Sequence, residues 1–287
     1  MPSLQKKWLA ALLVAAGFGA VYWAVMVKLV HDWYFDDNYS HGFLIIPLAV
    51  YLAWERRHRL KDSAAAPAGF GLVIVAGSLA LLLAGIYGSE LFLTRIALVG
   101  TVAGSVLFLF GWRWLRVMTF PIAILLLMIP IPAIIFNQIA FPLQILASRF
   151  GETVMGAADV PVLREGNVLI LANTTLEVAE ACSGIRSLVS LFTLAIVLGY
   201  FSDRRMWVRL LIAVSSVPVA VITNGLRVAG TGIAAHQFGP AAAEGFFHEF
   251  SGWLVFVAAF LLMLLIQQTI ARVAPGPPAA VASVATA

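Results

Sequence analysis

Three observations predict that this chain is an all-α, polytopic membrane protein with about eight transmembrane helices. Of its 287 residues, 62% are hydrophobic and only 11% are charged, whereas soluble domains contain about 25% charged residues. The mean hydropathy is +0.97. Apolar stretches near the length that crosses a bilayer, about 20 residues, recur along the chain. Helices are the expected spanning elements because a helix satisfies its own backbone hydrogen bonds in lipid.

Eight apolar segments are the predicted spans. They run from about 8 to 27, 43 to 54, 70 to 87, 91 to 110, 117 to 136, 185 to 201, 206 to 222 and 253 to 270. The first is too long for a typical signal-peptide core and lacks a clear cleavage site, so we expect a retained helix. The second has only about a dozen continuously apolar residues, which is short for a span. Pro130 and Pro132 are expected to break the far end of the fifth.

The region between the fifth and sixth spans is more polar and is predicted to lie outside the membrane. A surface helix is expected from Asn137 to Phe150. The stretch from Pro161 to Val178 alternates in hydrophobicity around the turn signal Glu165-Gly166-Asn167, which predicts a small β-hairpin just before Cys182. Residues 1–274 are expected to form one integral membrane domain, and the Pro/Ala/Gly-rich residues 275–287 a disordered cytoplasmic tail.

Clusters of basic residues predict the orientation, because cytoplasmic loops carry an excess of Lys and Arg. With Lys6 and Lys7 inside and eight crossings, the clusters at 56–61, 113–116, 204–209 and 272 all fall on the cytoplasmic side. Both termini are then cytoplasmic, and omitting the short second span would invert every later cluster. The outer face is predicted to contain residues 31–41, 137–184 and 223–252.

Three reactive side chains lie at the outer ends of the last three predicted spans. Cys182 precedes the sixth span, Arg227 follows the seventh and His248 precedes the eighth. A thiolate can act as a nucleophile, and a histidine can take its proton and return it to a leaving amine. An arginine can stabilise the thiolate or the oxyanion of a tetrahedral intermediate. We therefore expect acyl transfer if the three helices pack together.

Each of these residues also has a simpler interpretation. A lone cysteine cannot form an intramolecular disulfide, and most single cysteines are small buried hydrophobes. Arg227 alone is equally consistent with an interfacial anchor that reaches a lipid phosphate, and His248 alone with an ordinary interfacial histidine. His41, on the same predicted face, competes with His248 for the role of base.

Glu180, Arg186 and Asn224 are supporting candidates. Glu180 and Arg186 flank the cysteine and form either a structural ion pair or a pair that orients the site, and Asn224 precedes Arg227 by three residues. No pair of carboxylates or histidines in the sequence has metal-ligand spacing, and there is no Gly-rich phosphate loop. The sequence thus predicts no metal and no cofactor. The net charge of +4 is explained by the cytoplasmic clusters, and the absence of a basic stripe with interleaved aromatics predicts no nucleic-acid partner.

The segment from Leu176 to Leu188, which contains Cys182, resembles the signature of exosortases, membrane-embedded sortase analogues of Gram-negative bacteria that are related to archaeosortases. Further motifs agree in order along about residues 35–265. They are Tyr39-Ser40-His41-Gly42, Met128-Ile129-Pro130-Ile131-Pro132, Pro142-Leu143-Gln144, Val162-Leu163-Arg164-Glu165-Gly166-Asn167, Asn224-Gly225-Leu226-Arg227-Val228 and His248-Glu249-Phe250-Ser251-Gly252.

This resemblance implies a cysteine protease or transpeptidase of the cell inner membrane, with its active site facing the periplasm. Carried over by motif, the catalytic residues are Cys182, Arg227 and His248. The implied substrates are exported proteins with a C-terminal sorting signal, which consists of a short Pro-Glu-Pro-type (PEP-CTERM-like) motif, a transmembrane helix and a basic tail. Cleavage would proceed through a thioester that an acceptor nucleophile of unknown identity resolves. Because the bilayer also holds the substrate, its scissile bond arrives at a fixed height.

Two other classes of function remain open. An eight-span protein is by default a transporter or channel, in which Arg227 and nearby polar residues would form a substrate site near the midplane. Arg95 lies inside its predicted span, but the spans otherwise carry almost no internal charge, which argues mildly against transport. A non-catalytic subunit of an envelope polysaccharide export system is the other alternative. Loss of substrate cleavage on Cys182→Ala substitution would separate the enzyme from both.

Overall fold

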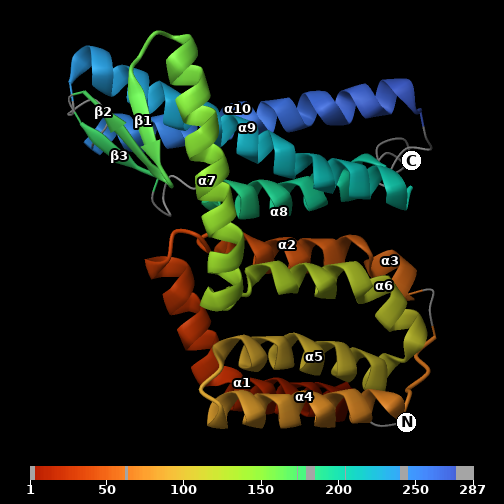
Figure 1. Ribbon diagram of the computed structural model, residues 1–287. Coiled ribbons are helices and arrows are strands. Elements are labelled where there is room, and N and C mark those ends of the chain that lie inside the picture. The colour runs from red at the N-terminus through yellow and green to blue at the C-terminus, as the bar shows by residue number, and fades with distance from the viewer. Residues whose placement is uncertain are drawn as a thin grey trace. The chain divides into compact units, whose positions relative to one another are not determined.

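The computed structural model of the chain describes residues 4–61, 64–172, 174–178, 185–203, 205–239 and 245–275, without the side chains of 4–11, 61 and 245–249. These residues are mostly helical and include one small sheet (Figure 1). In the described part, seven helices are long and apolar enough to cross a membrane, and a shorter apolar helix, Gly42–Glu55, accompanies them. The predicted class, a polytopic helical membrane protein, is confirmed. The chain divides into two compact units, residues 1–132 (unit 1) and 133–287 (unit 2).

Unit 1 is a layer of helices that closely follows the predicted spans. Its elements are α1 (Leu4–Phe35), α2 (Gly42–Glu55), α3 (Arg57–Lys61), α4 (Phe70–Tyr87), α5 (Leu91–Phe110), α6 (Trp112–Ala123) and the 3-10 helix η1 (Ile124–Met128). Helices α4 and α5 match the predicted third and fourth spans residue for residue and lie side by side (Figure 1). Gly71 permits this approach, because a Cβ atom there would meet the backbone of Phe108.

The predicted fifth span, residues 117–136, is wrong in its second half. The helical run ends with η1 at Met128, and Ile129–Pro132 are not helical. Pro130 and Pro132 account for this break, since proline disfavours helical backbone in the residue before it and donates no hydrogen bond. Helix α7 (Ala133–Ala157) then begins as a separate element and keeps Pro142 inside it. The expected surface helix at 137–150 is thus the central part of a 25-residue helix, and the prediction of a surface location is not supported, because this helix is one of the seven that are long and apolar enough to cross a membrane.

Unit 2 combines α7 with the sheet and three long helices. These are α8 (Ile185–Ser202), α9 (Met206–Phe238) and α10 (Gly245–Val273). They lie side by side, and α7 runs across them (Figure 1). Helix α8 begins at the predicted residue, but α9 and α10 are 33 and 29 residues long and extend well beyond the predicted spans 206–222 and 253–270. The extensions lie at the ends that carry Arg227 and His248.

The predicted hairpin is present and has a third strand. Strands β1 (Val162–Glu165), β2 (Val168–Leu171) and β3 (Thr175–Glu177) form an antiparallel sheet in the order β1-β2-β3 (Figure 1). Gly166 has a φ of +65°, which glycine adopts at little cost, and it makes the turn where the sequence predicted one. Val168 pairs with Glu177, so the sheet ends close to the segment that leads to Cys182.

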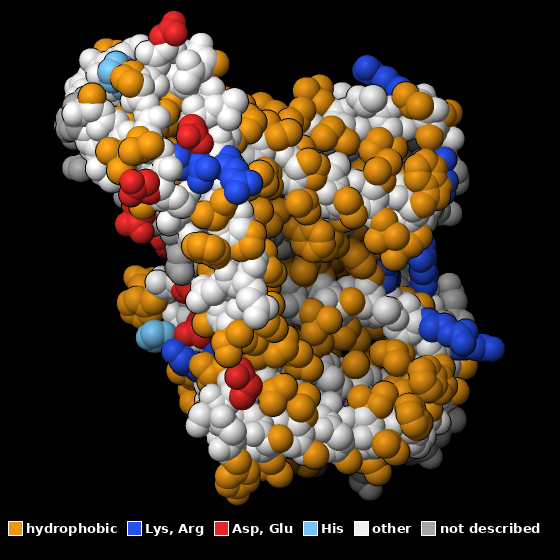
Figure 2. All heavy atoms as spheres, in the orientation of Figure 1, with side chains coloured by type: hydrophobic (Ala, Val, Ile, Leu, Met, Phe, Trp, Pro, Cys, Tyr) orange, Lys and Arg blue, Asp and Glu red, His pale blue; other side chains and the backbone are white. Residues whose placement is uncertain are grey.

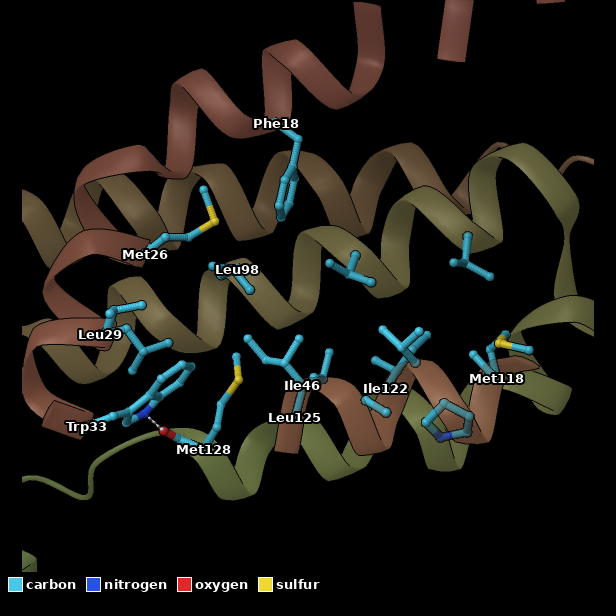
Figure 3. Close-up of a pocket in the computed structure, with 17 residues that line it drawn as sticks. Phe18, Met26, Leu29, Trp33, Ile46, Leu98, Met118, Ile122, Leu125 and Met128 are labelled. Carbon is cyan, nitrogen blue, oxygen red and sulfur yellow. Dashed lines mark hydrogen bonds between the residues drawn. The ribbon is translucent and has the colours of Figure 1, made fainter. Parts of the chain in front are cut away.

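The surface of each unit suits a lipid environment. On the face drawn in Figure 2, hydrophobic side chains cover the middle of the helices, and charged side chains gather toward the helix ends. Unit 1 also has an apolar cavity of about 460 Å³, open to the surface, between α1, α2, α5 and the α6–η1 run (Figure 3). Trp33 closes one end and donates a hydrogen bond from Nε1 to the carbonyl oxygen of Met128, 2.8 Å away. The described side chains that line this cavity are apolar, so the candidate chemistry lies elsewhere.

Candidate active site

Arg227 lies at a depth that two helices define independently. It is 21 residues beyond Met206, the first residue of α9, which corresponds to a rise of about 32 Å. Gly252 is 21 residues before Val273, the last residue of α10, and therefore also about 32 Å from that end. The hydrocarbon core of a bilayer is about 30 Å thick. Arg227 and Gly252 are thus each about one membrane thickness from the helix ends that adjoin the basic clusters.

The guanidinium of Arg227 rests against Gly252. A Cβ atom built on Gly252 would lie 3.2 Å from both Cζ and Nη2 of Arg227, so the missing side chain leaves the space that the arginine uses. His248 belongs to α10 four residues before Gly252, and residues four apart occupy the same face of a helix. The side chain of His248 is outside the described part of the chain. The backbone therefore brings Arg227 within about one turn of His248.

A buried cluster joins the strand that leads to Cys182 with the helix that carries Arg227. Val178 is 2% exposed and Val228 is 6% exposed, and both belong to one hydrophobic cluster with Met155 and Leu169. Val178 is four residues before Cys182, and Val228 follows Arg227 directly. Cys182 and Glu180 lie outside the described residues. The meeting of the thiol, the guanidinium and the imidazole in one site remains a prediction.

Close packing between α7 and α9 fixes this cluster. A Cβ atom at Gly225 would overlap the ring of Phe150, and one at Gly232 would overlap the sulfur of Met155. Small residues at helix crossings allow such close backbone approach inside membranes. Also on α7, the hydroxyl of Ser148 donates to the carbonyl oxygen of Gly166 at 2.9 Å. The sheet is therefore held on α7, and α7 is held on α9.

An ion pair adds a second attachment between the sheet and α7. Nε of Arg164 on β1 lies 2.7 Å from Oε2 of Glu152 on α7. Because both side chains are partly exposed, the pair contributes little stability on its own. The pair still joins β1 to α7 at one further point. The hydrogen bond from the backbone N–H of Val178 to the carbonyl oxygen of Asn167, at 2.9 Å, fixes the last residue before the predicted thiol segment.

The remaining supporting candidates lie on two helices of unit 2. Asn224 is 3% exposed in α9, and Arg186 is partly buried in the first turn of α8. Their part in the chemistry remains a prediction. Gly252 and Val178 were not among the predicted site residues. Gly252 could have been found, since it closes the motif that begins with His248, whereas the burial of Val178 depends on packing that no local pattern reveals.

His41, the competing histidine, has a structural role in unit 1. Its Nε2 donates a hydrogen bond to the carbonyl oxygen of Leu127, 3.1 Å away, and the hydroxyl of Tyr39 accepts one from the backbone N–H of Ile131 at the same distance. Burial lowers the pKa of His41 more strongly than the backbone hydrogen bond to Leu127 raises it. The loop before α2 is thus attached to the segment that follows η1.

Arg95, which lies a few residues into its predicted span, also has a structural partner. It is 3% exposed and forms a salt bridge with Asp32 of α1, which also binds Nζ of Lys28 at 2.9 Å. A buried charge is expected to be paired in this way. Within the residues that the structure describes, no group of three or more His, Cys, Asp or Glu side chains could hold a metal ion.

The comparison with protein-family models gives one match that covers most of the chain. The model described as "Transmembrane exosortase (Exosortase_EpsH)" matches residues 33–265. This range includes the positions of Cys182, Arg227 and His248. No curated protein and no solved structure shows a significant match.

Proposed function

The chain belongs to the transmembrane exosortase family, a family of membrane-embedded sorting enzymes, and we propose that it is a cysteine transpeptidase whose catalytic residues are Cys182, Arg227 and His248. The observation that carries this proposal is the shared packing in unit 2. One buried cluster contains Val178, four residues before the thiol, and Val228, adjacent to the arginine. The arginine in turn rests on Gly252, one helical turn from the histidine.

Each residue has a distinct task in the proposed reaction. The Cys182 thiolate attacks the carbonyl carbon of the scissile peptide bond, and the guanidinium of Arg227 stabilises the oxyanion that forms. Protonated His248 then donates a proton to the departing amine, the C–N bond breaks, and a thioester remains. Removing one stabilising donor of this kind typically lowers the rate by about 10²–10³-fold. A second nucleophile attacks the thioester and regenerates the thiol.

The depth of Arg227 supports a substrate that is itself held in the membrane. A site about one membrane thickness from the basic helix ends would meet a peptide just outside the hydrocarbon core. We therefore propose that the substrates are exported proteins whose C-terminal sorting signal consists of a Pro-Glu-Pro-type motif, a transmembrane helix and a basic tail. A bilayer anchor pre-positions such a motif at a constant height, and this lowers the entropic part of the barrier.

The basic clusters support one orientation. We propose a cell inner membrane location with both termini cytoplasmic and the site facing the periplasm. In this proposal residues 1–274 form the membrane domain and residues 275–287 a cytoplasmic tail, of which residues 276–287 lie outside the described part. Glu180, Arg186 and Asn224 would support the site by orienting the three catalytic residues.

The decisive experiment is co-expression with an exported protein that carries such a sorting signal. The wild-type chain should release a product whose intact mass corresponds to cleavage near the motif, and Cys182→Ala should leave the substrate uncut while inserting normally. A transporter or a non-catalytic subunit of an export system should tolerate this small change. Cleavage that persists in membranes containing the Cys182→Ala variant would therefore refute the proposed enzymatic activity.

A further inference from the structure

Strand β3 forms one edge of the sheet, close to the predicted nucleophile (Figure 1). Within the described part of the chain, β2 is the one strand that pairs with β3. The side chains of Thr175 and Glu177 on β3 are exposed. An edge strand presents N–H and C=O groups that can pair with a further chain. Because Val178 is buried and lies four residues before Cys182, this edge leads directly to the predicted thiol.

The hydrogen bonds of the sheet show which backbone groups face the open edge. The N–H of Val178 donates to the carbonyl oxygen of Asn167, 2.9 Å away at the turn between β1 and β2. Successive residues of a strand direct their N–H and C=O groups to opposite sides. Leu176, two residues before Val178, therefore faces β2. Thr175 and Glu177 direct their backbone groups toward the open edge.

This edge matches one particular pattern of backbone groups. In a parallel pair, a residue placed beside Leu176 donates its N–H to the carbonyl oxygen of Thr175 and accepts a hydrogen bond from the N–H of Glu177. The residues before and after it direct their backbone groups away from β3, so both can be prolines without loss of a hydrogen bond. Proline also favours extended backbone in the residue before it. A Pro-X-Pro segment thus fits this edge, with X as the residue that pairs.

Strand β3 runs toward the bilayer. Near its middle, Cδ1 of Leu176 lies 3.5 Å from a Cβ atom built on Gly232 of α9. Its end lies beside the β1–β2 turn, which Ser148 of α7 holds, and Phe150 of α7 contacts Gly225 of α9. Gly225 is seven residues, or about 10 Å, closer than Gly232 to the α9 end that adjoins the basic cluster. A chain that enters the membrane after its motif runs in the same direction as β3.

We propose that the Pro-Glu-Pro-type motif of the substrate adds to β3 as a fourth, parallel strand, with its central residue beside Leu176. The inference rests on the proposed function for the identity of its occupant. The pairing would direct the chain that follows the motif toward the segment that contains Cys182. Laterally adjacent residues share a face of a sheet, so the central glutamate lies on the face of Leu176. Its carboxylate is therefore on the opposite face from Glu177, and the two like charges do not meet.

Disulfide trapping tests this strand without requiring catalysis. Because Cys182 is the only cysteine, Cys182→Ala gives a cysteine-free protein into which Thr175→Cys or Glu177→Cys can be introduced. The substrate is the co-expressed exported protein with its one cysteine in place of either motif proline. Adjacent residues on neighbouring strands are about 5 Å apart, and a disulfide spans up to about 7 Å between Cα atoms. Mild oxidation should link Thr175→Cys to the first motif position and Glu177→Cys to the second.

Leu163→Cys on β1 is the matched control. Leu163 pairs with Ile170, which pairs with Thr175, so the three residues form one row on the same face of the sheet. Leu163 is 59% exposed but lies three strand spacings, or about 14 Å, from a strand added to β3. Equal trapping at Leu163→Cys would overturn the proposal. Linkage of Thr175→Cys to the second motif position would show an antiparallel arrangement and would also refute it.

A second arm measures processing with Cys182 present. Glu177→Pro removes the N–H that faces the open edge and leaves the hydrogen bonds to β2 in place. Glu177→Ala removes the same side chain and keeps the N–H. The proline variant should process the substrate about three- to tenfold more slowly than the alanine variant, the range expected for one lost hydrogen bond. Equal processing by two variants with the same thermal unfolding would contradict the pairing, and if the proline variant fails to fold, the trapping result decides.

The two proposals can fail separately. If Cys182→Ala stops cleavage but the substrate is not trapped at Glu177→Cys, the enzyme stands and the added strand is refuted. Disulfide-linked dimers of the chain at Glu177→Cys, in place of a substrate adduct, would assign the edge to a second copy and also refute it. Trapping in the predicted register despite continued cleavage by Cys182→Ala would support the strand and refute the nucleophile.

Discussion

Truncation of Val178 tests whether the sheet positions the predicted nucleophile. Val178 is 2% exposed and packs in the cluster that contains Met155, Leu169 and Val228. Val178→Ala removes two carbon atoms from this cluster, which costs about 1.6 kcal/mol at about 0.8 kcal/mol per buried group. The cavity left behind adds to this cost, because neighbouring side chains relax only partially. We expect a total loss of about 2–3 kcal/mol.

Leu163→Ala, on β1 of the adjoining sheet, is the matched control. It removes three carbon atoms, but Leu163 is 59% exposed, so little buried area is lost and the cost should stay below about 1 kcal/mol. If the number of carbon atoms removed decided the loss of stability, Leu163→Ala would be the more destabilising of the two variants. Thermal unfolding of the two detergent-solubilised variants would measure the difference in stability.

Substrate processing provides the second measurement. If Val178 positions Cys182 four residues later, as we propose, Val178→Ala should slow cleavage and Leu163→Ala should not, at a temperature where both variants remain folded. Labelling of Cys182 by a membrane-impermeant thiol reagent should change rate in the same variant. The reasoning is wrong if the two variants match each other in stability, cleavage and labelling.

Two further perturbations test other parts of the structure. Gly252→Val should slow substrate cleavage by about tenfold with little loss of stability, because the guanidinium of Arg227 must shift; Gly77→Val is the control, and equal rates would contradict this account. Since burial lowers the pKa of His41 below 6.5, its neutral form contributes stability that is fully present above pH 6.5 and lost as the pH falls through the lowered pKa. Thermal unfolding between pH 7.5 and 5 should therefore show a smaller loss for His41→Gln than for wild type, and parallel losses would assign the pH dependence to other groups.

Spans bounded by clear local signals could be predicted closely from the sequence. Helix α4 begins after a Pro/Ala/Gly stretch and α5 follows Gly88 and Glu90, whose side chain caps it. Between such boundaries an uninterrupted apolar run leaves little freedom in where a span starts or ends. The turn at Gly166 was equally well predicted, because its positive φ favours glycine.

The extension of α9 could not be predicted in the same way. Thr223, Asn224, Gly225 and Arg227 indicated a helix end near residue 222, yet α9 continues to Phe238. Asn224 is buried and Gly225 packs against Phe150, so tertiary contacts with α7 compensate for the low helix propensity of these residues. The glycine here serves close packing and does not end the helix. A sequence pattern of neighbouring residues cannot distinguish a glycine that packs against another helix from one that ends its own helix.

The two arginines near the outer ends of spans show why the site needs structure as well as sequence. In sequence both Arg95 and Arg227 are isolated cations beside apolar runs, and either could mark a transport pathway. Arg95 is 3% exposed and bound to Asp32, which explains its presence as a link between α1 and α5. Arg227 instead lines a groove of about 750 Å³. Helix packing therefore explains the one charge inside a span, whereas Arg227, on which a transport site was also expected to depend, lines space that a substrate can enter.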